Sequence, residues 1–250
     1  MTDTSRIAHY LNEFIKFFPI DRRFDAHTGL DHALARYNER HRFYHNADHL
    51  EDLFVELDKH APYLTDRELF KATAFIVFHD VVYNTDKAEN IALNEVHSAE
   101  KAEIFLQRCG ADNIVFQDKS LSDSTKISEE VCAAILMTRK HHADKDSMRL
   151  NKILLDMDMM ILASDRRRYM SYVDQVRREY TYFGFCNDNI FFEARRDMFL
   201  TDLLKKDRIF ITDEYENQYG DKARDNIRWE MDYCTRRLNM MAGFLKPQPK

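Results

Sequence analysis

Glycine and proline are scarce in this chain of 250 residues, which has 5 glycines and 4 prolines. Average usage would give roughly 17 and 12. Folds rich in β-strands need many tight turns, and turns favour these two residues, so their scarcity argues against such folds. No proline stands between Pro62 and Pro247, which permits long helices. We therefore predict an all-α fold, a helical bundle of about ten helices.

Further absences exclude several classes of protein. The four cysteines are far apart and form no Cys-x-x-Cys pair, so neither a zinc ribbon nor a disulfide framework is indicated. No apolar run reaches the roughly 18 residues of a membrane-spanning helix, and the N-terminus lacks a signal-peptide pattern. The net charge of -6 gives no general attraction to nucleic acid or to anionic lipid. We expect a cytoplasmic protein that binds neither a nucleic-acid polymer nor a membrane.

Apolar residues recur at helical spacing along most of the chain. The first stripe ends at Pro19, and the last alternates in steps of three and four until it stops near Gly243. No internal repeat or low-complexity linker divides the chain. We predict a single helical domain over 1–250, with an N-terminal helix within 1–22 and a long C-terminal helix over 213–243.

Two helix starts are indicated by capping residues. Asn46 precedes an apolar face of leucines and can cap that helix with its side chain. Thr65 and Glu68 stand three residues apart in the pattern of a capping box, which predicts the start of the next helix. A further helix fits 89–109.

Buried acids are the sharpest local feature of the sequence. The run ATAFIVFHDVVY (72–83) is apolar on every side of a helix, yet it contains His79 and Asp80. Asp156 and Asp158 interrupt the apolar run ILLDMDMMIL in the same way. A buried carboxylate costs several kcal/mol unless it is paired or bound to a metal. One metal ion would satisfy both sites, and hydrogen bonds from helix N-termini or a distant arginine are the alternative.

A pair of histidines supplies further candidate ligands. His45 and His49 are four residues apart, so they share one face if the helix begins near Asn46. Such a pair is common on solvated helices, and it gains weight only beside His79, Asp80 and a later buried acid. Imidazole and carboxylate together suit Mn, Fe, Co, Ni or Zn, and Mg when waters complete the sphere. We therefore expect a divalent metal ion as cofactor, without assigning its identity or deciding between one ion and two.

The ordered series His…His-Asp…Asp resembles the HD superfamily of metal-dependent phosphohydrolases. It is most similar to a bacterial family of predicted HD phosphohydrolases of about this length, over roughly residues 35–240. The motifs that carry the resemblance are Tyr44-His45-Asn46…His49-Leu50, Phe78-His79-Asp80…Tyr83, Asn94-Glu95…Ser98-Ala99, Thr138…His142, Leu155-Asp156…Asp158, Arg177…Glu179-Tyr180 and Ala223-Arg224…Asn226. One departure is Met159, where the family pattern has leucine.

The resemblance implies a set of metal ligands: His49, His79, Asp80 and Asp158, with Asp156 as the alternative fourth ligand. Residues two apart on a helix point about 200° apart, so we expect only one of the last two acids to bind directly. We favour Asp158, because Leu162 then follows it as the packing residue of the superfamily pattern.

The resemblance also implies catalytic roles. The Tyr-His-Asn…His motif resembles that of the cyclic-nucleotide phosphodiesterases, where the first histidine protonates the leaving group and the second binds metal. Carried over, His45 is the acid and His49 the ligand. A competing alignment begins at Arg42 and would make His45 the ligand. Asp80 would also orient the attacking water, and Glu95 would hold a metal-bound water or orient a ligand histidine.

The remaining candidates would bind the substrate. Charge on the phosphoryl oxygens needs fixed cations, for which Lys140, His142 and Arg177 are candidates, and Asn94 lies beside Glu95 in the family pattern. The alternative interpretation for each of these residues is a solvent-exposed position on a helix, without a role in binding.

The leading interpretation is a phosphohydrolase that hydrolyses a nucleotide or related small phosphoester by a metal-activated water. An alternative is a di-iron oxygenase of HD type, which uses two additional histidines that His97 and His142 would supply. A third is a non-catalytic nucleotide-binding module. The sequence leaves open whether the chain forms a homo-oligomer.

Overall fold

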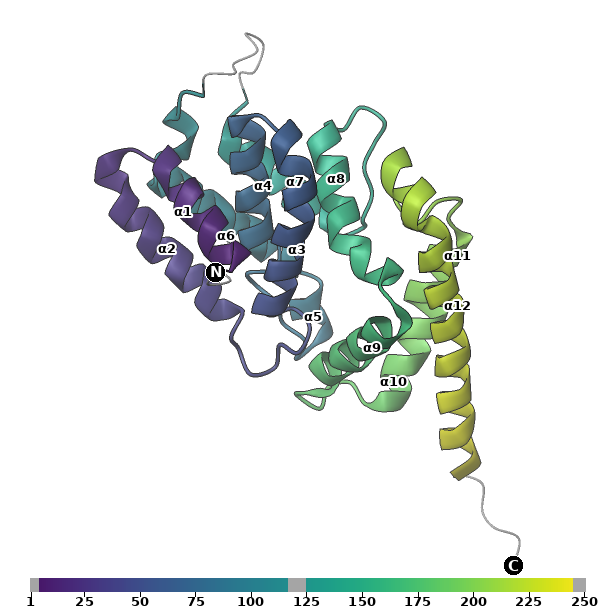
Figure 1. Cartoon of the computed structure of the whole chain (residues 1–250). Helices are drawn as coiled ribbons and strands as arrows, with labels where there is room; N and C mark the ends of the chain where they lie inside the picture. The colour runs from purple at the N-terminus through teal and green to yellow at the C-terminus, as the bar shows by residue number, and fades with distance from the viewer. Residues whose placement is uncertain (1–4, 117–124, 245–250) are drawn as a thin grey trace, which may run out of the picture. The chain divides into compact units, whose positions relative to one another are not determined.

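The structure, a computed structural model, describes residues 5–116 and 125–244, and within them every regular element is helical (Figure 1). This confirms the predicted all-α class and the bundle of about ten helices. The α-helices are α1 (Arg6–Phe17), α2 (Arg23–Arg36), α3 (Ala47–His60), α4 (Asp66–Phe78), α5 (Ala88–Ile91), α6 (Asn94–Arg108), α7 (Ile127–Thr138), α8 (Arg149–Asp158), α9 (Arg166–Thr181), α10 (Asp188–Ala194), α11 (Thr201–Lys205) and α12 (Asp213–Phe244).

Contacts group the chain into two compact units. Unit 1 comprises Met1–Asn84 and Ala88–Met157, and unit 2 comprises Thr85–Lys87 and Asp158–Lys250. The boundary at Asp158 falls on the last residue of α8. The single domain predicted over 1–250 stays a prediction. Within the described residues, no helix combines the length and the apolar character needed to cross a membrane.

Helix α4 is the central helix of unit 1. It begins at the predicted capping box: the Glu68 backbone N–H donates to Thr65 Oγ1 at 3.2 Å, and the Thr65 N–H donates to Glu68 Oε2 at 3.0 Å. Its residues from Phe70 to Phe78 are all buried, because α1, α2, α3, α6 and α7 each pack against it. The helix ends earlier than the predicted 72–83 stretch, since Phe78 is its last residue and His79 is its C-cap.

Helix α3 places His49 in the interior of unit 1. Asn46 caps it, as predicted, by accepting a hydrogen bond from the Asp48 N–H at 2.9 Å. The buried face of the helix contains Leu50, Leu53, Phe54 and Leu57. His49 lies beside this face and is only 3% exposed. The local sequence thus fixes both the start of the helix and the burial of a candidate ligand.

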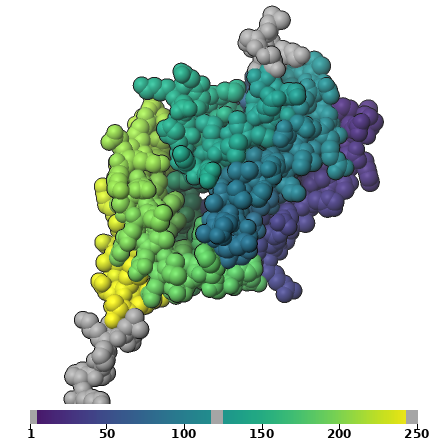
Figure 2. Space-filling model, turned by 180° about the vertical axis from the view of Figure 1, so that it is seen from behind, coloured from purple at the N-terminus to yellow at the C-terminus, as the bar shows by residue number. Residues whose placement is uncertain are grey.

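Helices α2 and α6 of unit 1 pack closely at one glycine. A Cβ atom built on Gly29 would lie 2.6 Å from Phe105 Cδ2, a distance that side chains do not tolerate. Figure 2 shows the first helices, in purple, beside teal residues of unit 1. Because Gly29 has no side chain, the Phe105 ring fits against α2 and joins an aromatic cluster. The other members of that cluster are Phe14, Phe18, Phe70 and Phe78.

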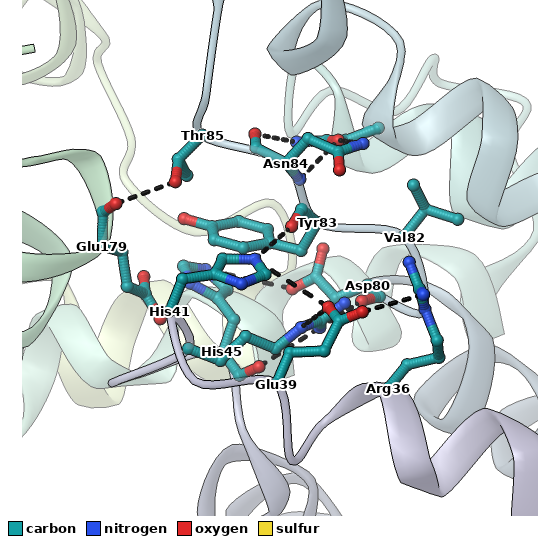
Figure 3. A network of polar contacts seen from close by, with 12 residues as sticks. Arg36, Glu39, His41, His45, Asp80, Val82, Tyr83, Asn84, Thr85 and Glu179 are labelled. Carbon is teal, nitrogen blue, oxygen red and sulfur yellow. Dashed lines mark hydrogen bonds and ion pairs between the residues drawn. The ribbon is translucent and has the colours of Figure 1, made fainter. Parts of the chain in front are cut away.

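Unit 2 is built around α12. The Asn226 amide donates to the carbonyl oxygens of Leu162 and Ser164 at 2.8 and 2.9 Å, which ties α12 to the 3-10 segment after α8. The short segment Thr85–Lys87 belongs to this unit, where Thr85 Oγ1 donates to the Glu179 carbonyl at 2.8 Å (Figure 3).

Candidate metal centre

Three predicted ligands converge in the structure. His49 lies on α3, His79 directly follows α4, and Asp158 is the last residue of α8. One ligand atom from each lies within 4.8 Å of the other two. Asp158 continues the helix whose preceding residues belong to unit 1, so the continuous backbone of α8 carries it.

The orientation of His79 is fixed by its backbone neighbour. The ring is 1% exposed, and its Nδ1 lies 3.0 Å from the Ile76 carbonyl oxygen. A carbonyl oxygen only accepts, so Nδ1 carries the proton and donates it. With the proton on Nδ1, the neutral form of the ring presents the lone pair of Nε2 toward the cluster, as in many metal-binding histidines.

The distance between the two imidazoles fits a shared ion. His49 Nε2 and His79 Nε2 are 3.2 Å apart. Two nitrogen ligands about 2.1 Å from one ion, at angles between about 90° and 109°, are separated by about 3.0–3.4 Å. A proton shared between the rings fits the same distance. The mixed imidazole and carboxylate donors suit the divalent transition metals.

Asp156 and Asp158 lie differently, although both belong to α8. Asp156 is only 1% exposed and is not a member of the converging group. Asp158 is half-buried and joins the two histidines. The structure therefore places Asp158, the acid that the sequence favoured, beside the two histidines. Its role as a metal ligand stays a prediction.

Asp80 and His45 lie next to this group. Asp80 Oδ2 is 3.3 Å from His79 Nε2 and 3.9 Å from His45 Nε2. Each of the two side chains is 19% exposed, in contrast to His49 and His79. The His45 ring stacks on Tyr83, with centroids 4.1 Å apart and planes at 25° (Figure 3). These two groups are thus polar, close together and partly accessible.

Arg42 is a positioning residue whose contacts the sequence did not predict. Its side chain is fully buried, and it donates to the carbonyl oxygens of Asp80 at 2.7 Å and Val81 at 3.1 Å. His41 lies on the same segment, with Nε2 2.8 Å from the Tyr83 carbonyl oxygen (Figure 3). Together these side chains hold the backbone turn that carries Asp80. In the sequence, Arg42 stood out only as the first residue of the competing alignment, in which His45 is the metal ligand.

Asn94, predicted to bind substrate, contacts the backbone after the His-Asp pair. Its Oδ1 accepts from the Asn84 N–H at 2.9 Å, and its Nδ2 donates to the Asn84 carbonyl oxygen at 3.0 Å. Ser98, one turn later on α6, exchanges hydrogen bonds with the backbone of Val82. In the structure, the Asn94 amide therefore fixes this loop. Its contact with substrate stays a prediction.

Glu95 lies in the electrostatic surroundings of Asp80. Burial raises the pKa of the Glu95 carboxyl, and the negative charge of Asp80 adds to the increase. Its own backbone N–H and the charges of Arg139 and His141 oppose it without cancelling it. The shift favours the protonated acid, a form that can donate a proton.

His141 was missed in the sequence, where its neighbour His142 was favoured. The backbone of His141 has a positive φ of 42°, which is uncommon for any residue other than glycine. This conformation accompanies a half-buried side chain that acts on the pKa of Glu95. The family motif includes the second histidine of the pair, and nothing in the local sequence indicates the turn in the backbone.

The other histidines and the lysine of the prediction lie at exposed positions. His142 is 71% exposed and 3.4 Å from the Asp144 carboxylate. His97 is 44% exposed and 3.0 Å from Glu100. Lys140 is exposed as well. Within the described part of the chain, none of these three residues belongs to the group of His49, His79 and Asp158.

Arg177 belongs to unit 2, where two acids pair with it. Its guanidinium donates to Asp188 Oδ1 and to Asp174 Oδ1, each at 2.9 Å. Burial lowers the pKa of Arg177, but its hydrogen bonds to Asp174 and Asp188 outweigh burial and raise the pKa overall. Arg177 thus forms ion pairs with acids of its own unit. Its role in binding a substrate stays a prediction.

Comparisons with known proteins found no significant match to a family model, to a curated protein or to a solved structure. The resemblance to the HD superfamily therefore rests on the motif residues, and the functional argument rests on the geometry of the side chains.

Proposed function

We propose that the chain is a metal-dependent phosphohydrolase of the HD type, which hydrolyses a nucleotide or related small phosphoester. The observation that carries the proposal is the convergence of His49, His79 and Asp158, with the proton of His79 directed away toward a carbonyl oxygen. The proximity of Asp80 and His45 adds the groups that proton transfer needs.

The three converging residues would hold a divalent ion, with Asp80 as an additional ligand. When bound, such an ion supplies a water of lowered pKa and polarises a phosphoryl oxygen. The donor set fits Mn, Fe, Co, Ni or Zn, and Mg with additional waters.

Asp80 orients the attacking water in this proposal. A carboxylate accepts hydrogen bonds at both oxygens, so one oxygen can direct a water while the other faces His79. Arg42 keeps the backbone of Asp80 in place, because it donates to that residue's carbonyl oxygen. The backbone that carries the carboxylate is thereby held before substrate arrives, which lowers the entropic cost of reaction.

His45 donates a proton to the departing oxygen. It precedes α3 rather than lying within it, and its Nε2 faces the Asp80 carboxylate at 3.9 Å. Tyr83 stacks on one face of the ring and limits its rotation. Glu95 is a second proton carrier in this region, and Arg139 and His141 add positive charge near it.

A panel of phosphoesters tests the proposal. Nucleoside monophosphates, cyclic nucleotides and nitrophenyl phosphate are incubated with protein that has been analysed for metal, with and without chelator. We expect metal-dependent release of product from at least one member. His79→Ala and Asp80→Ala should both abolish bound metal and turnover. Asp80→Ala should still fold, because it removes a partly exposed side chain. Unchanged metal content in both variants would contradict the proposal.

A further inference from the structure

A cavity of about 510 Å³ lies in unit 1 between α2, α4 and α6. Its volume is within the range of small-molecule sites, about 300–1,000 Å³. The floor consists of apolar side chains from all three helices and from the turn after α4. These floor residues are Ala33, Phe78, Val81, Val82 and Phe105. An occupant would therefore bury an apolar body against a preformed wall.

The rim of the cavity is apolar on two sides and exposed. Phe24 on α2 is 81% exposed, and Ile104 on α6 is 52% exposed. Leaving two large apolar side chains in water at the mouth of an apolar cavity is unfavourable, and an apolar ligand would cover both.

The charge around the cavity is predominantly positive. Four basic residues line it, against the single acid Asp25; they are His32, Arg36, Lys101 and Arg108. Arg36 is paired with Glu39 at 2.8 Å. Lys101 and Arg108 are exposed and form no ion pair within 4.0 Å with any acid of the described residues. The two cations are thus available to an anionic group at the mouth.

The apolar floor of the cavity offers no hydrogen-bonding side chain, which argues against a nucleotide base at that position. Thr28 Oγ1 already donates to the Phe24 carbonyl oxygen at 3.0 Å. A base placed here would bury polar edges without partners, which is costly. We therefore propose that this cavity is a binding site for a small amphipathic anion, a medium-chain alkyl carboxylate. The proposal concerns binding only and does not depend on the proposed hydrolase activity.

Calorimetric titration of the full chain with decanoate tests the site. We expect saturable binding of one decanoate per chain, and weaker binding or none for decyltrimethylammonium, which has the same tail with the opposite charge. Adenosine monophosphate should not compete. The double variant Lys101→Glu/Arg108→Glu should weaken decanoate binding about tenfold or more, because repulsion replaces attraction at the mouth. The control Lys126→Glu changes another exposed lysine, one that lies outside the cavity, and should bind decanoate as wild type does.

Ile104→Asp provides a second test that acts on the apolar rim. It should also weaken decanoate binding, and circular dichroism melting of each variant reports whether it folds. If the double variant does not fold, Ile104→Asp decides the matter. The proposal is overturned if wild type shows no saturable decanoate binding, if the cationic analogue binds equally well, if adenosine monophosphate displaces decanoate, or if folded cavity variants retain wild-type affinity.

Discussion

Two buried polar clusters differ in how their charges are arranged. In unit 2, Glu230 is completely buried and accepts hydrogen bonds from Arg195 Nε at 2.8 Å and from Tyr169 Oη at 2.5 Å. Each acceptor there faces a donor supplied by the chain itself. In the candidate metal centre, His49, His79 and Asp158 instead direct ligand atoms toward one another.

The difference separates a structural ion pair from a candidate metal site. Arg195 neutralises Glu230 within unit 2, and Tyr172 Oη accepts a further bond from the same guanidinium at 3.0 Å. Such a network is stabilised by its own members and needs no additional ion. Converging imidazole and carboxylate groups, by contrast, gain most from an added cation. Burial alone does not distinguish the two cases; the direction of the donor atoms does.

The largest effect is expected from His45→Ala, which separates catalysis from metal binding. Proton donation contributes about 10²–10⁴ in rate, so kcat should fall by that factor while the metal content stays unchanged. The loss should shrink for nitrophenyl esters, whose leaving group departs without a proton. Metal content of His45→Ala and His49→Ala, measured side by side, is the check. If only His45→Ala loses the ion, the roles of the two histidines are reversed.

Glu230→Ala should destabilise the protein strongly, whether or not metal is present. The change leaves Arg195 buried without its carboxylate, and breaking a buried pair costs about 3–5 kcal/mol. Denaturant unfolding with and without chelator measures the cost. The matched variant Arg195→Met/Glu230→Leu removes both charges and should cost less than the single change. A chelator-dependent cost for Glu230→Ala would contradict the view of this network as self-contained.

Lys71→Met tests a second self-contained cluster, this one within unit 1. Burial raises the pKa of the Glu130 carboxyl, but hydrogen bonds from Arg67 and Lys71 outweigh it and lower the pKa overall. The stabilisation is therefore present above the unfolded pKa, about 4.3, and is lost as pH falls through the lower folded value. The variant should lose about 1–3 kcal/mol near neutral pH, and its unfolding free energy should decline less on acidification. An unchanged acid dependence would argue against this coupling.

The smallest effect is expected at Glu51, an acid that accepts hydrogen bonds from two backbone groups and from one hydroxyl. It accepts from the Arg6 and Ile7 N–H groups at 2.7 and 3.2 Å and so caps α1 from α3. Burial raises the pKa of the Glu51 carboxyl, but these bonds and one from Ser5 together outweigh burial and lower the pKa overall. Glu51→Ala should cost about 0.5–1 kcal/mol above the unfolded pKa and less as pH falls below it. Unfolding curves at two pH values measure this, and an equal cost at both would contradict the assignment.

The sequence predicted helices best where local chemistry decides them. The caps at Asn46 and Thr65 hold because the side chain and its backbone partner are only two or three residues apart. The helix predicted over 89–109 is divided into α5 and α6, and Asn94 there binds the backbone of Asn84. That contact is tertiary, so periodicity could not reveal it.

The candidate site was predictable in its residue types but not in its supporting contacts. Apolar periodicity continues past His79, and the chain nevertheless leaves the helix there, since Arg42 binds the carbonyl groups of the following turn. The conformation of His141 and the proximity of Glu95 to Asp80 likewise depend on packing between distant segments. Such contacts have no signature in a single sequence.

Metal analysis of Asp158→Asn beside Asp156→Asn shows whether His49, His79 and Asp158 hold a metal ion. Both changes remove one acid from α8 with little change in volume, and only Asp158 belongs to the converging group. We expect at least one divalent ion per chain in wild type, retention of that ion in folded Asp156→Asn, and its loss in folded Asp158→Asn. Wild-type protein that binds no divalent ion, or Asp158→Asn protein that keeps it, would rule out the proposed metal centre.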